Sequence, residues 1–155
     1  MINRTTAASL VASASVIVGI AVHEGYSSTA YKDTVGVATI GYGQADGTKM
    51  GDKTDPVRAL VKLEESLDDH AKGMVKCIHV PISQGEYDAY LDFTYNVGVF
   101  AFCTSTLDRK LNAGDYEGAC KELLKWNKAD GKVVAGLTKR RQEEYAQCSQ
   151  QSNSN

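Results

Sequence analysis

Three polar residues near the N-terminus are of the types that could cleave a glycosidic bond: Glu24, Asp33 and Thr39. Such cleavage uses a proton donor for the leaving oxygen and a second carboxylate that activates water or attacks the sugar. Glu24 ends an apolar stretch and Gly25 lets the chain turn away, so we expect this carboxyl among apolar neighbours, where the pKa of a proton donor rises. We expect the more solvated Asp33 on the first strand of a hairpin. The Thr39 hydroxyl, on the returning strand, would hold a water beside it.

The elements that would position these residues begin with a small β lobe. Valine, isoleucine and tyrosine residues interrupted by glycines over 31–43 predict a β-hairpin or meander, and a polar loop follows over 44–54. Asp55 and Pro56 mark the start of a long helix, because Asp is a favoured cap and Pro a favoured first helical residue. Apolar residues at steps of three and four place this helix over 56–75, with Leu60, Leu63, Leu67, Ala71 and Met74 on its buried face.

Helix signals dominate the second half of the chain. Ser83 and Glu86 form a capping-box pattern, and the helix that they begin should end at Gly98. Further helices are expected over about 105–112, from the capping residue Asp115 to Trp126, and over about 136–148, before a tail, 149–155, of disordered composition. The fold class is therefore expected to be α+β, with a small β-hairpin lobe and a larger helical lobe joined by the long helix.

Composition and charge exclude several classes of protein. With 155 residues the chain is long enough for one domain with a sizeable core, and a net charge of −2 gives no basis for nucleic-acid binding. The one basic cluster, at 139–141, is interpreted as a solvated helix face. No cysteine lies in a CxxC pair and the three histidines are scattered, so neither a metal site nor a cofactor is expected.

The cysteine count leaves the redox state open. Four cysteines fit two disulfides outside the cytoplasm or buried thiols inside it, and they permit three pairings. They are Cys77, Cys103, Cys120 and Cys148.

A weakly hydrophobic segment precedes Glu24. Residues 5–22 are uncharged, and their number is about the minimum for a helix across a bilayer core of ~30 Å. Eleven of them are Ala, Ser, Thr or Gly, and seven are Leu, Val or Ile. The residues alone allow a membrane segment, a signal peptide cleaved near the Ala-Ser-Ala at 12–14, or a buried first helix of the fold. Cleavage there would remove the helix that leads into Glu24, which weighs against a signal peptide.

The order Glu, eight residues, Asp, five residues, Thr resembles the signature of glycoside hydrolase family 24, the phage-type lysozymes or endolysins. The motifs EG, AYKD and TIGYG around Glu24, Asp33 and Thr39 are also similar to that family. Two later blocks, over 93–119 and 126–144, resemble its helical-lobe motif and its closing segment. The resemblance covers roughly 15–148 and implies a single lysozyme-like catalytic domain there.

The resemblance implies a muramidase that hydrolyses the β-1,4 bond between N-acetylmuramic acid and N-acetylglucosamine in peptidoglycan and so lyses the host cell. Glu24 would be the general acid, Asp33 the carboxylate that governs the water or the intermediate, and Thr39 the supporting hydroxyl. Many relatives have a histidine where this chain has Gln44. Because the three catalytic residues are intact, we expect this change to tune the hairpin or the edge of the cleft and to leave activity in place.

The resemblance also extends to the helical lobe. Tyr95, Asn96 and Ser105 fall where this lobe contacts sugar, although Tyr95 fits a core position and Ser105 a helix cap equally well. Relatives of this shape carry cysteines on the last two helices, which implies a disulfide between Cys120 and Cys148 and leaves Cys77 to pair with Cys103.

In this family an N-terminus rich in Ala, Ser and Gly resembles a signal-arrest-release segment, which enters the inner membrane uncleaved and later leaves it. Small polar residues lower the cost of leaving lipid. We therefore favour transient membrane association through 5–22 of the N-terminal segment 1–22, followed by action in the periplasm of the infected bacterium. The expected partner is a glycan strand, and the expected state is a monomer.

Two rival functions stay open. A lytic transglycosylase would use one glutamate on the same polymer and close the product into an anhydro sugar, without a carboxylate that activates water. A non-catalytic wall-binding protein would need no catalytic residues. The match at Asp33 and Thr39 favours hydrolysis, and the absence of a zinc ligand set disfavours an amidase.

Overall fold

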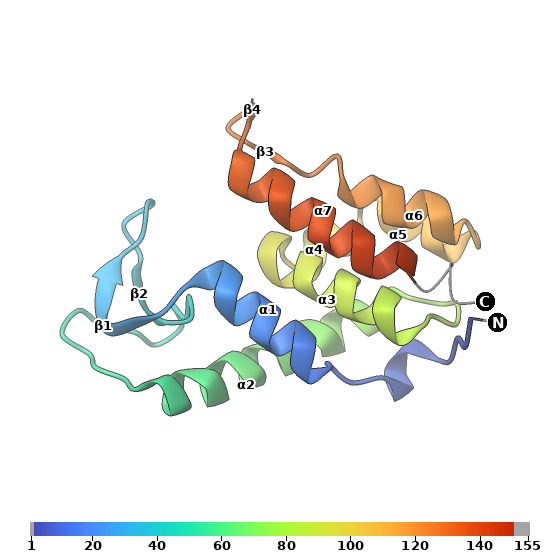
Figure 1. The fold of residues 1–155 in the computed structure, drawn as a ribbon. Helices are drawn as coiled ribbons and strands as arrows, with labels where there is room; N and C mark the ends of the chain where they lie inside the picture. Colours follow the sequence, from blue (N-terminus) through green and yellow to red (C-terminus); the bar gives the residue numbers. More distant parts are fainter. Residues whose placement is uncertain (1, 151–155) are drawn as a thin grey trace. The chain divides into compact units, whose positions relative to one another are not determined.

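The chain forms two compact units, which a computed structural model describes over residues 2–150 (Figure 1). The first, here called the hairpin unit, comprises residues 14–68. The second, the helical unit, comprises residues up to 13 and from 69 onward. Helices and small antiparallel sheets occur together, which confirms the expected α+β class.

The hairpin unit contains helix α1 (Ala14–Glu24), strands β1 (Ser27–Lys32) and β2 (Ala38–Gly41), and the first turns of α2 (Pro56–Val75). The two strands are antiparallel, with Tyr31 opposite Thr39. The predicted polar loop over 44–54 returns to β1 and pairs with it. The N–H of Ala30 donates to the carbonyl of Asp52 at 3.0 Å, so β1 is held on both sides.

Helix α2 has the predicted bounds, and its start follows from the capping residue. The Asp55 carboxylate accepts hydrogen bonds from the backbone N–H groups of Val57 and Arg58, both at 3.0 Å. The buried stripe begins at Ala59, whereas Leu60, predicted to be buried, is 42% exposed. Leu60 lies about 100° around the helix from its neighbour, which carries it off the stripe. The other buried residues are the four predicted: Leu63, Leu67, Ala71 and Met74.

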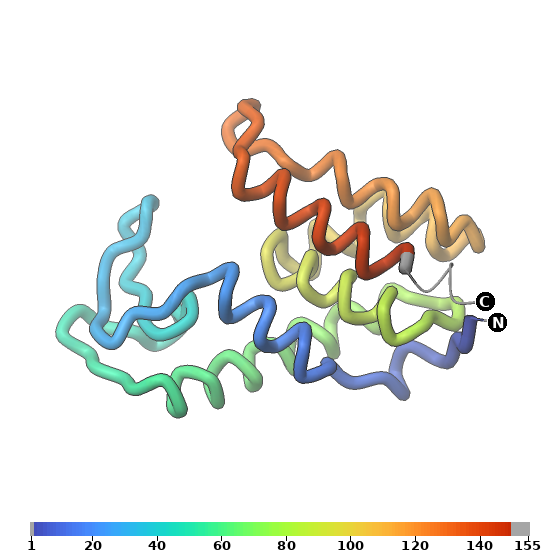
Figure 2. Tube along the Cα trace, in the orientation of Figure 1, coloured from blue at the N-terminus to red at the C-terminus, as the bar shows by residue number. Residues whose placement is uncertain are grey.

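The helical unit is formed by a short 3₁₀ turn (Ala7–Ser9), the helices α3 (Gln84–Val97), α4 (Val99–Cys103), α5 (Thr106–Asn112), α6 (Tyr116–Leu123) and α7 (Ala135–Gln150), and the short strands β3 (Lys128–Ala129) and β4 (Lys132–Val133). Helix α3 packs against α7, and α5 against α6, as the chain trace shows (Figure 2). The core comprises Tyr90, Phe93, Phe102, Leu107, Leu111 and Leu123.

The predicted helix signals of this unit are confirmed, with differences at the ends. Ser83 and Glu86 form the capping box of α3, which ends at Gly98. The sixth helix stops at Leu123, short of the expected Trp126, because the chain turns there into β3. The hairpin of β3 and β4 was expected to be a loop, and its tight turn is at Asp130 and Gly131, both with positive φ. Ser149 and Gln150, expected in a disordered tail, belong to α7, and residues 151–155 lie outside the described residues.

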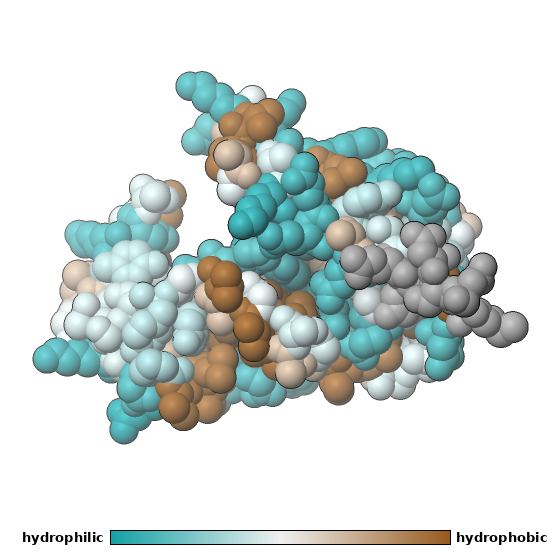
Figure 3. All heavy atoms as spheres, in the orientation of Figure 1, coloured by the Kyte–Doolittle hydropathy of each residue, from teal (hydrophilic) through white to brown (hydrophobic). Residues whose placement is uncertain are grey.

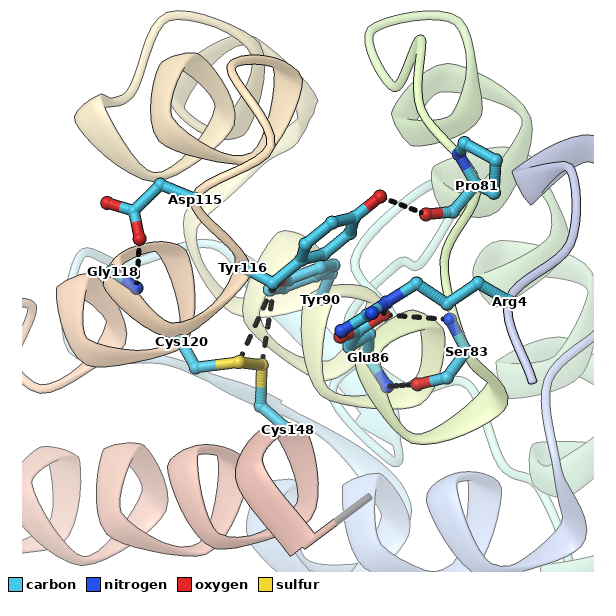
Figure 4. A network of polar contacts seen from close by, with 10 residues as sticks. All are labelled: Arg4, Pro81, Ser83, Glu86, Tyr90, Asp115, Tyr116, Gly118, Cys120 and Cys148. Carbon is cyan, nitrogen blue, oxygen red and sulfur yellow. Dashed lines mark hydrogen bonds and ion pairs between the residues drawn. A yellow bond between two sulfur atoms is a disulfide. The ribbon is translucent and has the colours of Figure 1, made fainter. Parts of the chain in front are cut away.

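Residues 5–22 do not form one continuous helix. The 3₁₀ turn and an extended stretch precede α1, and within residues 2–150 no helix is both long and apolar enough to span a membrane. Thr5 forms an isolated β-bridge with Ile82, and the guanidinium of Arg4 donates to both carboxylate oxygens of Glu86 at 2.7–3.2 Å (Figure 4). The same guanidinium lies 3.6 Å from the centre of the Tyr116 ring. The start of the chain is therefore bound to the helical unit.

Two disulfides join Cys77 to Cys103 and Cys120 to Cys148, the pairing that the family resemblance implies. Their Cα atoms lie 5.5 and 5.7 Å apart, within the usual range for a disulfide. The second bridge ties α6 to α7, and both of its sulfur atoms contact the hydroxyl of the buried Tyr90 (Figure 4).

The interpretation of 139–141 as a solvated face is wrong for two of its three residues. The Arg140 and Arg141 side chains are 8% and 1% exposed. Arg140 binds Asp92 at 2.6 Å, and Arg141 binds both carboxylate oxygens of Glu144 at 2.7 and 2.9 Å. Buried charges require such partners, so this cluster belongs to the interior of the helical unit.

Candidate active site

Glu24 is the last residue of α1, and its carboxyl lies against a tight turn that follows β2. The chain leaves the helix at Gly25, which has a φ of +71°. A Cβ atom placed on Gly43 would lie 2.9 Å from Oε2 of Glu24, closer than real side chains permit. The backbone of this turn therefore covers one side of the half-buried carboxyl.

Asp33 lies one residue beyond β1, in the turn of the hairpin, and not on the strand as expected. Its Oδ1 accepts hydrogen bonds from the N–H groups of Val35 and Val37 at 3.0 and 2.8 Å. An aspartate that binds the backbone in this way favours a turn over a strand. The strand therefore ends before Asp33, and the two bonds fix the orientation of its carboxylate.

Thr39 lies on β2, as predicted, and is 5% exposed. Its hydroxyl donates to the carbonyl oxygen of Val37 at 3.1 Å, and the N–H of Asp33 donates to the same oxygen at 2.9 Å. The peptide of Val37 thus connects the two predicted catalytic residues. All three predicted catalytic residues belong to the hairpin unit.

The three predicted sugar-contacting residues belong to the helical unit. Tyr95, on α3, is half-buried, with its ring 5.0 Å from that of His70. Ser105 is 8% exposed and caps α5, because its Oγ accepts from the N–H of Asp108 at 3.0 Å and donates to the carbonyl of Phe102 at 2.7 Å. Ser105 is therefore a helix cap, which is the alternative that the sequence also allowed.

Asn96 is exposed near the end of α3, and its amide oxygen accepts a hydrogen bond from the guanidinium of the buried Arg141. Burial lowers the pKa of Arg141, while the neighbouring Glu144 opposes this shift. Burial also raises the pKa of Glu144 to about 8, against the opposing effect of Arg141. Through this hydrogen bond Arg141 holds the Asn96 amide with its oxygen toward the interior of the helical unit.

Sequence reasoning missed the part of Gly43 in the site. The glycines of the TIGYG motif were interpreted only as breaks in a β-hairpin, although a glycine is also the residue that permits close approach of another group. Among residues 2–150, no group of three or more His, Cys, Asp or Glu side chains could hold a metal ion.

The chain is similar to known proteins in both sequence and structure. The family model described as "Phage lysozyme" matches residues 21–144. An endolysin of Acyrthosiphon pisum secondary endosymbiont phage 1 is 41% identical over 80% of this chain and 88% of its own length. A SAR-endolysin of Pseudomonas phage phiKMV is 36% identical over 87% of this chain and 86% of its own length. The structure of an endolysin from Escherichia coli O157:H7 phage FAHEc1 has a TM-score of 0.81 and 33% identity, covering 90% of this chain and 93% of that one.

Proposed function

The chain belongs to the phage lysozyme family, and we propose that Glu24, Asp33 and Thr39 carry its catalysis. The protein is a lysozyme-type glycoside hydrolase with the lysozyme-like fold, an endolysin that cleaves peptidoglycan and lyses the host cell. The bond cleaved is the β-1,4 link between N-acetylmuramic acid and N-acetylglucosamine. The observation that supports the proposed residues is that they belong to one compact unit, in which Asp33 and Thr39 both donate to the carbonyl oxygen of Val37.

In the proposed mechanism Glu24 gives its proton to the leaving glycosidic oxygen. Asp33 orients a water and receives its proton as that water adds to the anomeric carbon. The two N–H groups that bind Oδ1 keep the carboxylate in place, and neither of them uses Oδ2. Thr39 donates its hydroxyl proton to the Val37 carbonyl, so its oxygen is oriented to accept a hydrogen bond from the same water.

Replacing Asp33 by asparagine is expected to lower the rate of peptidoglycan clearing by roughly 10²-fold or more, because an amide cannot take the proton of the attacking water. The amide oxygen can still accept the two backbone hydrogen bonds, so the fold should be retained. The rate is measured as the loss of turbidity of purified peptidoglycan.

The matched control is Asp46→Asn, which changes an exposed aspartate of the same unit and should clear at the wild-type rate. Equal clearing by wild type and Asp33→Asn would remove Asp33 from the mechanism. No clearing by the wild type would contradict the function itself.

The proposal extends to the helical unit, where Tyr95, Asn96 and Ser105 would contact the glycan strand. Asn96 is the best placed of the three, since its side chain is exposed and its amide is held from behind by Arg141. Ser105 is already engaged as a helix cap, so its contact would use the remaining lone pair of the hydroxyl. The protein would act as a monomer.

We further propose that the protein associates with the inner membrane through residues 5–22 before it acts in the periplasm. Relatives named SAR-endolysins support the association. The surface of α1 supports it as well, because Val18 and Val22 are 60% and 73% exposed, where a helix of a soluble fold usually carries polar residues. Figure 3 shows exposed hydrophobic side chains around α1 and over the first turns of α2.

The contacts of Arg4 suggest how release and folding are coupled. A bilayer-spanning segment of residues 5–22 would place Arg4 on the opposite side of the membrane from Glu86, so their ion pair could form only after release. Glu86 is 2% exposed, and a buried carboxylate without its partner is destabilising. The docking seen in Figure 4 would then stabilise only the released form.

The substitution Gly19→Leu is expected to raise the ratio of membrane-bound to soluble protein in cells by about twofold or more, because leucine favours insertion into a bilayer. The folded form should accept the change, since no heavy atom lies within 4 Å of a Cβ at this position. The measurement is fractionation of cells into membrane and periplasm, with intact mass of the chain in each fraction.

Gly136→Leu is the matched control, because it adds the same side chain to open space on α7, outside the segment. It should leave the distribution unchanged. A wild-type chain found only in the periplasm, or a Gly19→Leu chain distributed like the wild type, would contradict the membrane proposal.

A further inference from the structure

The side chain of Gln44 braces the turn that follows β2. Its amide oxygen accepts a hydrogen bond from the N–H of Tyr42 at 2.8 Å, and its amide nitrogen donates to the carbonyl of Ala59 at 3.4 Å. Its backbone forms both hydrogen bonds with Ile40, each at 2.9 Å. One residue therefore closes the turn on itself and attaches it to the first turns of α2.

The amide of Gln44 packs closely against Gly41. A Cβ on Gly41 would lie 2.3 Å from the amide oxygen of Gln44 and 2.9 Å from the Cβ of Ala59. Gly41 also has a φ of +63°, which L side chains rarely adopt. The amide of Gln44 thus occupies the space that the glycine provides, between the backbone of the turn and α2.

The same turn is the wall against which Glu24 packs. Gly43 lies between Gln44 and Tyr42, whose N–H donates to the Gln44 amide oxygen. A Cβ on Gly43 would lie 2.9 Å from Oε2 of Glu24. Both hydrogen bonds of the Gln44 amide are made to this turn or from it to α2.

We propose that Gln44 is a positioning residue for catalysis: by bracing residues 40–44 against α2, it holds the Gly43 backbone against the carboxyl of Glu24. This inference rests on the proposed role of Glu24 as the general acid. Gln44 does not need to touch the substrate, and it acts only through the turn.

The decisive variant is Gln44→Leu, which keeps the approximate size of the side chain and removes both amide hydrogen bonds. The Tyr42 N–H then lacks its acceptor and the turn moves away from Glu24. Because misplacement of a catalytic group by about 1 Å can cost 10²-fold in rate, we expect kcat to fall on the order of 10- to 100-fold with KM nearly unchanged.

A second variant, Gln44→Glu, keeps an acceptor for the Tyr42 N–H and loses only the longer bond to Ala59. It should retain more of the wild-type kcat than Gln44→Leu. The control is Asp52→Ala, which removes another hydrogen bond of the same unit, that from the Lys49 N–H at 2.8 Å, and should leave kcat unchanged.

The experiment measures kcat and KM on soluble peptidoglycan fragments, with thermal unfolding of each variant. An unchanged kcat in a folded Gln44→Leu protein would overturn the inference, and so would a lower melting temperature with wild-type catalysis. If Gln44→Leu fails to fold, Gln44→Glu decides. A wild-type kcat in Gln44→Glu would mean that the bond to Ala59 does not matter, and it would overturn the inference. Loss of the proposed function itself would appear differently, as an inactive wild type or an active Glu24→Gln variant.

Discussion

Replacing Glu24 by glutamine is expected to lower the rate of peptidoglycan hydrolysis by roughly 10²- to 10⁴-fold, the contribution of a positioned general acid. The amide has nearly the same shape as the carboxyl but cannot donate an acidic proton to the leaving oxygen. The contact of the side chain with Gly43 should survive, so folding should be preserved. The measurement is the initial rate of turbidity loss of purified peptidoglycan, with the melting temperature of each protein.

Glu64→Gln is the matched control, because Glu64 is exposed on α2 within the same unit. It makes the same chemical change away from the site and should clear at the wild-type rate. A Glu24→Gln protein whose clearing rate is within a few-fold of the wild-type rate would exclude Glu24 as the acid. A variant that no longer folds would indicate a structural role for this residue.

The second large effect is expected for Arg141→Met, which should lower the free energy of unfolding by about 3–5 kcal/mol. The guanidinium of Arg141 binds Glu144 through two bonds and the carbonyl of Trp126 at 3.1 Å, and it lies 4.8 Å from the centre of the Phe93 ring. Methionine would fill most of the space but leave the Glu144 carboxylate buried without this partner. Equilibrium unfolding in denaturant, with both disulfides intact, measures the change.

Two companion variants separate the lost ion pair from lost packing. Lys139→Met changes an exposed side chain of the same helix and should alter stability little. Arg141→Met/Glu144→Gln should be more stable than Arg141→Met alone, because it also removes the buried carboxyl, whose remaining ionic partner is Arg140 at 3.6 Å. A single variant as stable as the wild type, or a double variant no better than the single one, would contradict the account of this cluster.

The predictions that succeeded rest on local chemistry. The capping box of Ser83 and Glu86 and the cap at Asp55 fixed helix starts because they satisfy backbone groups within a few residues. The prediction that Asp33 lies on the first strand was wrong, also because of local chemistry. The Asp33 side chain binds two N–H groups of the turn, and these bonds favour a turn over a strand. The alternation of residue types along the sequence does not reveal them.

The failures concern partners that lie far apart in the chain. Arg140 is a surface residue by type, and its burial depends on Asp92, which lies on another helix 48 positions away. The brace by Gln44 has a similar origin, because its acceptor in α2 is 15 positions further along the chain. The uncharged segment 5–22 suggested one helix, but contacts of Arg4 and Thr5 with residues beyond position 80 hold its first part in another conformation.

The most direct test of the central claim is the chemical form of the products released from purified peptidoglycan, determined by mass spectrometry. Hydrolysis by an acid and a carboxylate that governs water predicts muropeptides with reducing N-acetylmuramic acid ends, formed by the wild type and not by Glu24→Gln. Products lighter by one water, with anhydro ends, would contradict hydrolysis and leave Asp33 without its proposed role.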